Sequence, residues 1–272
     1  MFPNRFAGKT MVITGGATGI GLEVAKRAAL EGANVVIGSR NQEHGDAAIA
    51  EITAAGGKAI FVKTDVTRVE DVKNLYVQAK AKFGNVQIAV NNAGVLHDSA
   101  TIFEMTDAEW DRVIKTNLYG MFYSAREAFV HMKEVGEGGS ILNLGSVAGI
   151  NGMPSASAYC ASKHGVNGLT KSIAMDGRFY NIRCNTTNPA GTDTPLTKAN
   201  GDAMKMKIYE MQKAGKDFKP FLKECMGGMK AALPLGRNYT AAEQAAAILF
   251  IVSDECPLTG AIVATDGGWT AY

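Results

Sequence analysis

The stretch KTMVITGGATGIGLEVAKRAALEG, residues 9–32, decides the fold. Its apolar first part predicts a buried strand, and its alanine-rich second part predicts a helix that Gly32 ends. Gly15, Gly19 and Gly21 form a turn between the two. Such a turn lets the backbone approach a pyrophosphate, which the free N–H groups and the dipole of the helix would bind. A tight turn without a ligand is the alternative interpretation.

Composition and charge exclude several classes of protein. With 272 residues, of which 46% are hydrophobic and 20% charged, the chain can bury a full core as one large α/β domain or two small ones. Its net charge of +2 is too small to indicate nucleic acid or a membrane surface as a partner. No apolar run approaches the length that crosses a bilayer, and the first residues do not read as a signal peptide.

The cysteines show no spacing that is typical of a metal site. The four lie far apart, at Cys160, Cys184, Cys225 and Cys256. Scattered cysteines of this kind predict reduced thiols, a cytoplasmic location and no bound metal.

Strands and helices alternate along the remainder of the chain. Apolar runs predict further strands over residues 34–38, 59–62, 86–90, 140–144, 182–187 and 259–264. Helical patterns cover residues 42–55, 67–83, 106–131 and 240–252. Thr67 with Glu70 has the spacing of a capping box, and Thr106 and Thr240 open their helices with a glutamate three residues later. This alternation predicts parallel strands joined by crossover helices.

The end of the second strand bears on the choice of cofactor. In a strand–helix–strand unit this end meets the adenosine ribose, where an acidic residue would bind the 2′-hydroxyl of NAD. The chain has Ser39 and Arg40 there instead. A hydroxyl and a guanidinium suit a 2′-phosphate, which favours NADP(H). NAD(H) stays open, because Thr18 adds no second positive charge and Arg40 can also be read as a solvated loop residue.

Polar residues follow later strands or interrupt a helix. Asn91-Asn92-Ala93-Gly94 and Ser146 come directly after strands, at the edge of a parallel sheet where ligands bind. Asn117 stands inside a predicted helix, where asparagine is unfavourable, so a polar role and an exposed or locally hydrogen-bonded side chain are both open. Taken singly, each of these motifs also suits an ordinary loop or turn.

Tyr159 and Lys163 have the spacing that places two side chains on one face of a helix. An ammonium beside a phenol favours the phenolate, so we expect Lys163 to lower the pKa of Tyr159 from its usual value of about 10. A phenol tuned in this way can exchange a proton with a reacting oxygen. A tyrosine and a lysine at this spacing are also common without a function, so the surrounding motifs decide.

In order and spacing, these motifs resemble those of the short-chain dehydrogenases/reductases. The matching motifs are Thr14-Gly15-x-x-x-Gly19-x-Gly21, Asn91-Asn92-Ala93-Gly94, Asn117, Ser146 and Tyr159-x-x-x-Lys163. The resemblance extends from about residue 6 to residue 269. It implies an α/β fold with a Rossmann-like, doubly wound parallel sheet of seven strands and helices on both faces. It also implies a nicotinamide cofactor and hydride transfer between a carbonyl and an alcohol.

The resemblance implies a role for each matching residue. Tyr159 is expected to be the general acid or base, and Lys163 to lower its pKa and bind the nicotinamide ribose. Ser146 is expected to orient the substrate oxygen, and Asn117 to hold a water of a proton relay. The residues expected to bind the cofactor are Gly15, Thr18, Gly19, Ile20, Gly21, Ser39, Arg40, Asp65, Val66, Asn91, Ala93, Gly94, Tyr159, Lys163, Pro189, Gly191, Thr192 and Thr194.

Two positions depart from the family pattern. Ala190 stands where glycine is usual, and Thr192 stands where isoleucine or valine usually presents its backbone to the nicotinamide carboxamide. Backbone contacts survive a change of side chain, so we expect cofactor binding to persist. The Cβ of Ala190 can narrow the substrate pocket.

Residues 1–272 are predicted to form one domain, with a cofactor-binding core over residues 6–194 and 234–269 and a substrate lid over residues 195–233. The lid segment is rich in methionine, lysine and glycine, which suits an adaptable apolar pocket with hinges. The alternative is a pair of amphipathic helices that pack their methionines on the core. Its lysines can attract an anionic substrate or form a solvated helix face.

The sequence therefore predicts an NADP(H)-dependent ketone reductase or secondary-alcohol dehydrogenase that acts on a small molecule. The resemblance implies a homotetramer or homodimer, packed through the helices of residues 107–133 and 159–177. One alternative is a nucleotide-sensing protein without catalysis, which should lack Ser146, Tyr159 or Lys163, and all three are present. The other is an isomerase or dehydratase with a tightly bound cofactor, although such relatives are generally longer at the C-terminal side.

Overall fold

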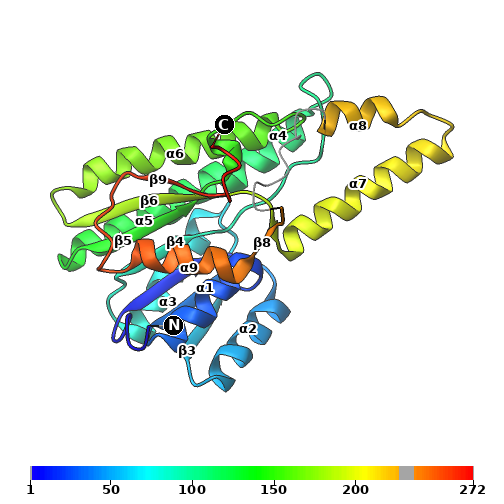
Figure 1. Cartoon of the computed structure of the whole chain (residues 1–272). Helices are drawn as coiled ribbons and strands as arrows, with labels where there is room; N and C mark the ends of the chain where they lie inside the picture. Colours follow the sequence, from blue (N-terminus) through cyan, green and yellow to red (C-terminus); the bar gives the residue numbers. More distant parts are fainter. Residues whose placement is uncertain (1, 227–235, 272) are drawn as a thin grey trace.

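The computed structural model describes residues 2–226 and 236–271 (Figure 1). At its centre is a parallel sheet of seven strands in the order β3-β2-β1-β4-β5-β6-β9. These strands are β1 (Thr10–Thr14), β2 (Asn34–Ser39), β3 (Lys58–Lys63), β4 (Ile88–Asn91), β5 (Gly139–Leu144), β6 (Ile182–Pro189) and β9 (Ile262–Thr265). The predicted doubly wound α/β fold is confirmed.

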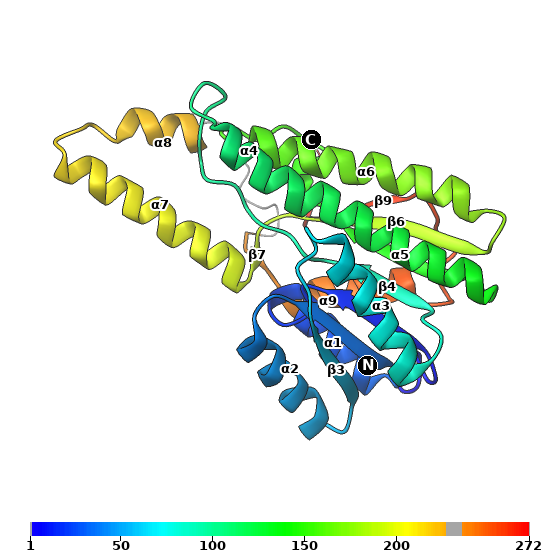
Figure 2. The ribbon, with the colours of Figure 1, turned by 180° about the vertical axis from the view of Figure 1, so that it is seen from behind.

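Helices cover both faces of the sheet (Figures 1 and 2). One face carries α1 (Gly19–Leu30), α2 (Gln42–Ala54) and α9 (Ala241–Val252). The other carries α3 (Val69–Phe83), α5 (Gly120–Val135) and α6 (Ser157–Gly177). In the described part of the chain, no helix combines the length and the apolar character needed to cross a bilayer.

Each central strand is buried on both faces, which explains the apolar runs in the sequence. In β1, Met11 and Ile13 join the core under α1 and α9, whereas Val12 joins the core under α3 and α5. Successive side chains of a strand point to opposite faces, so one short run supplies both cores. The sheet therefore forms the rigid layer on which the loops at its carboxyl edge are mounted.

The strand order reverses beside β1. Thr14, the last residue of β1, pairs with Gly38 of β2 on one side and with Asn91 of β4 on the other. The carboxyl ends of β1, β2 and β4 thus lie side by side, next to the glycine-rich turn that follows β1. In open α/β sheets ligands bind in the crevice at such a point of reversal.

Two of the three predicted helix caps are confirmed. The hydroxyls of Thr106 and Thr240 each accept a hydrogen bond from the backbone N–H three residues later, at 3.2 Å in both cases. The capping box predicted at Thr67 is wrong, because α3 begins at Val69 and Arg68 takes the cap position. Asp65 accounts for the difference, since its carboxylate accepts hydrogen bonds from both the backbone N–H and the hydroxyl of Thr67.

The helix predicted over residues 106–131 contains a wide turn. After α4 (Asp107–Ile114), the π-helical segment Lys115–Tyr119 precedes α5, and the N–H of Gly120 donates to the carbonyl of the residue five positions earlier. A Cβ at position 120 would lie 2.7 Å from Cγ2 of Val66, so the glycine permits close packing here. Wide turns of this kind occur frequently at functional sites, and this one carries Asn117.

Two helices of the predicted lid extend away from the sheet as an arm, α7 (Pro195–Lys213) and α8 (Lys219–Met226) (Figures 1 and 2). No residue of α7 is buried. The alternative in which this helix packs its methionines on the core is therefore wrong for α7, because the helix projects beyond the sheet. Residues 227–233 of the predicted lid lie outside the described residues. At the base of the arm, β7 (Thr192–Asp193) pairs with β8 (Tyr239–Thr240).

Candidate active site

The glycine-rich turn is held in a fixed shape by Asn92. The side-chain amide of Asn92 donates to the carbonyls of Thr14 at 3.1 Å and Gly15 at 2.9 Å. Gly15 has a φ of +65°, which favours glycine, and a Cβ at Gly21 would lie 2.4 Å from the carbonyl oxygen of Gly15. The turn and the helix start therefore approach each other so closely that only hydrogen fits between them.

The start of α1 suits an anion. Gly19 begins the helix with a φ of +56°, the first turn holds no acidic residue, and the hydroxyl of Thr18 does not cap it. Free N–H groups at a helix start bind phosphate, so the residues present fit the pyrophosphate of a dinucleotide. A Cβ at Gly19 would lie 3.4 Å from the side chain of Thr194. Thr194, a predicted cofactor-binding residue directly before α7, therefore lies next to the same turn.

The predicted adenosine contacts meet at the neighbouring strand ends. Ser39 ends β2, and Arg40 follows it as an exposed residue. The carbonyl of Ser39 accepts a hydrogen bond from the N–H of Thr64 at 2.9 Å, which sets the segment of Asp65 and Val66 beside it. The structure thus brings these four predicted residues to one edge of the sheet.

On the nicotinamide side, Gly94 lies against two of the predicted catalytic residues. A Cβ at Gly94 would be 3.2 Å from Oδ1 of Asn117 and 3.9 Å from Nζ of Lys163. Beyond β6, Ala190 is half-buried, and its carbonyl accepts a hydrogen bond from the Thr192 hydroxyl at 3.0 Å. The two departures from the family pattern therefore contact each other through the hydroxyl that Thr192 introduces.

Ser146, Tyr159 and Lys163 converge at the carboxyl end of β5. Ser146 lies at the start of the 3-10 turn Val147–Gly149, where its N–H donates to Oδ1 of Asn188 at 3.1 Å. Its hydroxyl is close enough to the phenol of Tyr159 to lower the pKa of that phenol. Lys163 is 3% exposed, and its ammonium donates to the carbonyl of Leu144 at 2.7 Å. The three predicted residues thus form one cluster.

Burial dominates the electrostatics of this cluster. Burial raises the pKa of the Tyr159 phenol above its usual value, while the nearby Ser146 hydroxyl acts in the opposite direction. Burial also lowers the pKa of Lys163 to about 8. The ammonium lies 5.7 Å from the centre of the Tyr159 ring. The expectation that Lys163 lowers the tyrosine pKa is wrong in direction, because burial raises the pKa of the phenol.

Asn117 is fully buried and holds a loop. Its Oδ1 accepts from the N–H of Val95 at 2.8 Å, and its Nδ2 donates to the carbonyl of Val95 at 2.9 Å. The interpretation of Asn117 as an exposed helix residue is therefore wrong. Its amide nitrogen also lies 3.4 Å from the hydroxyl of Ser162 on α6. The predicted water relay stays a prediction.

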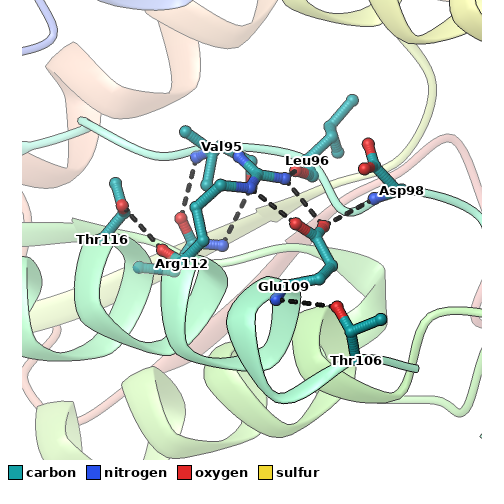
Figure 3. A network of polar contacts seen from close by, with 8 residues as sticks. Val95, Leu96, Asp98, Thr106, Glu109, Arg112 and Thr116 are labelled. Carbon is teal, nitrogen blue, oxygen red and sulfur yellow. Dashed lines mark hydrogen bonds and ion pairs between the residues drawn. The ribbon is translucent and has the colours of Figure 1, made fainter.

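Sequence reasoning missed His97, three residues after Gly94. Its ring lies beside Tyr159, with the centroids 5.5 Å apart. The neighbouring backbone is tied to α4 through Arg112 and Glu109, as Figure 3 shows. The only signal in the sequence is a histidine shortly after the Asn-Asn-Ala-Gly motif, and its burial depends on these long-range contacts.

A family model described as short chain dehydrogenase matches residues 9–205. The chain belongs to the short-chain dehydrogenase family. This short-chain dehydrogenase is 46% identical to a 3beta-hydroxysteroid dehydrogenase of Mediterraneibacter gnavus, with 98% of this chain and 97% of the relative covered. It is 33% identical to a cyclohexanol dehydrogenase of an Acinetobacter species, with 98% and 97% covered.

The fold comparison agrees. The solved structure of a levodione reductase has a TM-score of 0.86 and 30% identity, and covers 98% of this short-chain dehydrogenase and 100% of its own chain. With these relatives, the chain is an oxidoreductase that transfers hydride between a nicotinamide cofactor and an alcohol or ketone.

Proposed function

We propose that this short-chain dehydrogenase oxidises a secondary alcohol on a carbon ring, or reduces the corresponding ketone, with NADP(H). The observation that carries the proposal is the convergence of Ser146, Tyr159 and the buried Lys163 at the carboxyl end of β5, with the ammonium 5.7 Å from the centre of the tyrosine ring. The ring preference is supported by two relatives, because 3β-hydroxysteroid and cyclohexanol both denote a hydroxyl on a carbon ring.

The proposed roles follow from the contacts of each side chain. Tyr159 gives a proton to the substrate oxygen in reduction and takes it in oxidation, and Ser146 holds that oxygen by a hydrogen bond. Lys163 binds the nicotinamide ribose, and Asn117 holds a water in the proton path. The nicotinamide supplies or accepts the hydride, while the protein fixes the geometry.

The preference for NADP(H) is supported by the residues after β2. Ser39 offers a hydroxyl and Arg40 an exposed guanidinium where a 2′-phosphate of the adenosine ribose would lie. A guanidinium binds a phosphate through two charge-assisted hydrogen bonds. The pyrophosphate itself would be held by the turn of Gly15, Gly19 and Gly21.

A homodimer or homotetramer is part of the proposal. Large apolar side chains are exposed on α5 and α6, including Phe122 at 40%, Val130 at 43% and Met175 at 59%. Apolar faces of this kind suit contacts between subunits. The arm of α7 and α8 is proposed as the substrate lid, and the single domain and the cytoplasmic location stay predictions.

The proposal is tested by reduction of NADP⁺ and NAD⁺ in parallel, followed at the absorbance of the reduced nicotinamide. The substrates are cyclohexanol, a 3β-hydroxysteroid and an open-chain secondary alcohol. We expect turnover of the ring alcohols, at least tenfold higher in kcat/KM with NADP⁺. A preference for the open-chain alcohol contradicts the ring assignment. Cofactor binding without turnover of any alcohol or ketone favours a sensor, and a bound cofactor that is never exchanged favours an isomerase.

A further inference from the structure

The imidazole of His97 lies beside the predicted catalytic tyrosine. His97 is 9% exposed, and its Nδ1 is buried without a hydrogen-bond partner within residues 2–226 and 236–271. The ring planes of His97 and Tyr159 are inclined at 34°, with their centroids 5.5 Å apart. A buried polar atom that lacks a partner destabilises a protein. A histidine kept in this state next to reacting groups points to a hydrogen-bonding partner from outside the chain.

The position of His97 is fixed from both sides. The N–H of Asp98 donates to Oε1 of Glu109 at 2.7 Å, and Nη2 of Arg112 donates to the carbonyl of Leu96 at 2.8 Å (Figure 3). Glu109 and Arg112 also form an ion pair one helical turn apart on α4. This network holds the backbone before and after His97, so the imidazole is presented to the site by a rigid support.

The surroundings keep the imidazole neutral. Burial lowers the pKa of His97, Arg112 acts in the same direction, and the nearby carboxylates of Glu109 and Asp98 oppose them. A neutral imidazole has one N–H donor and one nitrogen acceptor. His97 can therefore pair with either a hydroxyl or a carbonyl oxygen, and its chemistry does not favour an anion.

The segment that leads into α6, residues 155–157, also contains buried polar atoms without a hydrogen-bond partner among the described residues. The hydroxyls of Ser155 and Ser157 are buried and have no partner in the described part of the chain. Ser155 has a φ of 54°, a strained conformation for a serine, and its carbonyl accepts from the N–H of Ala100 at 3.3 Å. That contact joins the loop of His97 to the segment leading into α6. Unpartnered polar atoms are thus found on both segments that flank Tyr159.

We propose that His97 is a substrate-binding residue, and that its imidazole hydrogen-bonds a second oxygen of the substrate on the carbon next to the reacting one. This inference rests on the proposed function, in which Tyr159 pairs with the reacting oxygen. Because the imidazole and the phenol are neighbours, a vicinal ring diol or a 2-hydroxyketone can engage both groups at once. Ring alcohols with an adjacent hydroxyl or carbonyl are therefore the preferred substrate class.

The test compares cyclohexanol with cis-cyclohexane-1,2-diol, which differ by the second oxygen. The measured quantity is the ratio of kcat/KM for the diol to kcat/KM for cyclohexanol. His97→Phe keeps a ring against Tyr159 but removes both nitrogens, and we expect it to lower the ratio at least tenfold, mainly through KM of the diol. His97→Asn keeps an amide near the place of Nδ1 and should restore part of the ratio. His164→Phe, a change of an exposed histidine on α6, is the matched control.

A merely structural role of His97 predicts an equal loss for both substrates in His97→Phe, and an unchanged ratio overturns the proposal. A second measurement does not need turnover. The chain has four histidines, so the imidazole signals of 15N-histidine-labelled protein are few, and His97→Phe assigns one of them. We expect the His97 signals to shift when the diol binds with NADP⁺, and to stay unchanged with cyclohexanol. If the wild type oxidises neither alcohol, the proposed function fails, while a static His97 signal on diol binding overturns this inference alone.

Discussion

The side-chain amide of Asn117 bonds both backbone groups of Val95, accepting from its N–H at 2.8 Å and donating to its carbonyl at 2.9 Å. The pair mimics the ladder of a β-sheet, with a side chain in place of the second strand. It connects the wide turn between α4 and α5 to the loop that leads from Gly94 to His97. Asn117 therefore supports the loop that carries both Gly94, a predicted cofactor contact, and His97, the neighbour of Tyr159.

Asn117→Ala should destabilise the protein through this loop. The change leaves the N–H and the carbonyl of Val95 without their partner, and we expect a loss of about 2 kcal/mol in the free energy of unfolding. Chemical denaturation at a fixed protein concentration measures it. Thr116→Ala is the matched control, because it removes only a hydroxyl that donates to the carbonyl of Arg112 at the surface, and it should cost under about 0.5 kcal/mol. Equal losses in the two variants would show that the Val95 contact contributes nothing.

The fold was predictable because its signals are local. The apolar runs of the strands identify buried parallel strands, and Gly21 is required by its close approach to the carbonyl of Gly15 within the same strand–turn–helix unit. The cap at Thr67 was not predictable from spacing, because Asp65 competes for the same donors. The Thr67 case shows that the spacing of a motif does not decide the structure where a neighbouring side chain accepts hydrogen bonds from the same donors.

The proximity of Tyr159 and Lys163 was predictable from their spacing, but their electrostatics were not. The direction of the tyrosine pKa follows from burial, which the spacing of two residues does not reveal. His97 is buried by contacts with α4 that lie more than ten positions along the chain. Motif spacing carries no information on such tertiary contacts.

Tyr159→Phe should abolish turnover and spare cofactor binding. The change removes the phenol oxygen that we assign to proton transfer, and it keeps the ring packed beside His97. We expect kcat to fall at least a thousandfold, while the Kd for NADPH, measured by its fluorescence, changes less than about threefold. Retention of a tenth or more of the wild-type kcat would contradict the assigned role.

Gly21→Ala should weaken the binding of the cofactor. An added Cβ would lie 2.4 Å from the carbonyl of Gly15, so the turn must open and its shape toward a pyrophosphate is lost. We expect the Kd for both NADPH and NADH to rise at least tenfold, as measured by calorimetry. Gly201→Ala in α7 is the control, because a Cβ there meets nothing within 4 Å. Unchanged affinity in Gly21→Ala would mean that the cofactor does not use this turn.

Arg40→Ala separates the two nicotinamide cofactors. If the guanidinium binds the 2′-phosphate, its loss should raise the Kd for NADPH at least tenfold and leave that for NADH within about twofold. Arg68→Ala serves as the control, since Arg68 is a similarly exposed arginine that pairs with Asp71. Equal losses for NADPH and NADH in Arg40→Ala would show that Arg40 does not distinguish them.

Lys163 should make the stability of the protein rise with pH. Burial lowers its pKa to about 8 in the folded state, against a usual value of about 10.4 in an unfolded chain. Between these two values the unfolded chain binds more protons, so the free energy of unfolding increases as the pH rises.

Relative to Lys163→Met, which has no such group, the wild type should gain on the order of 2 kcal/mol between pH 7.5 and pH 9.5. Urea denaturation across this range, at constant ionic strength and protein concentration, measures the difference. Parallel stability profiles for the two proteins would show that Lys163 titrates in the folded state as it does in the unfolded chain.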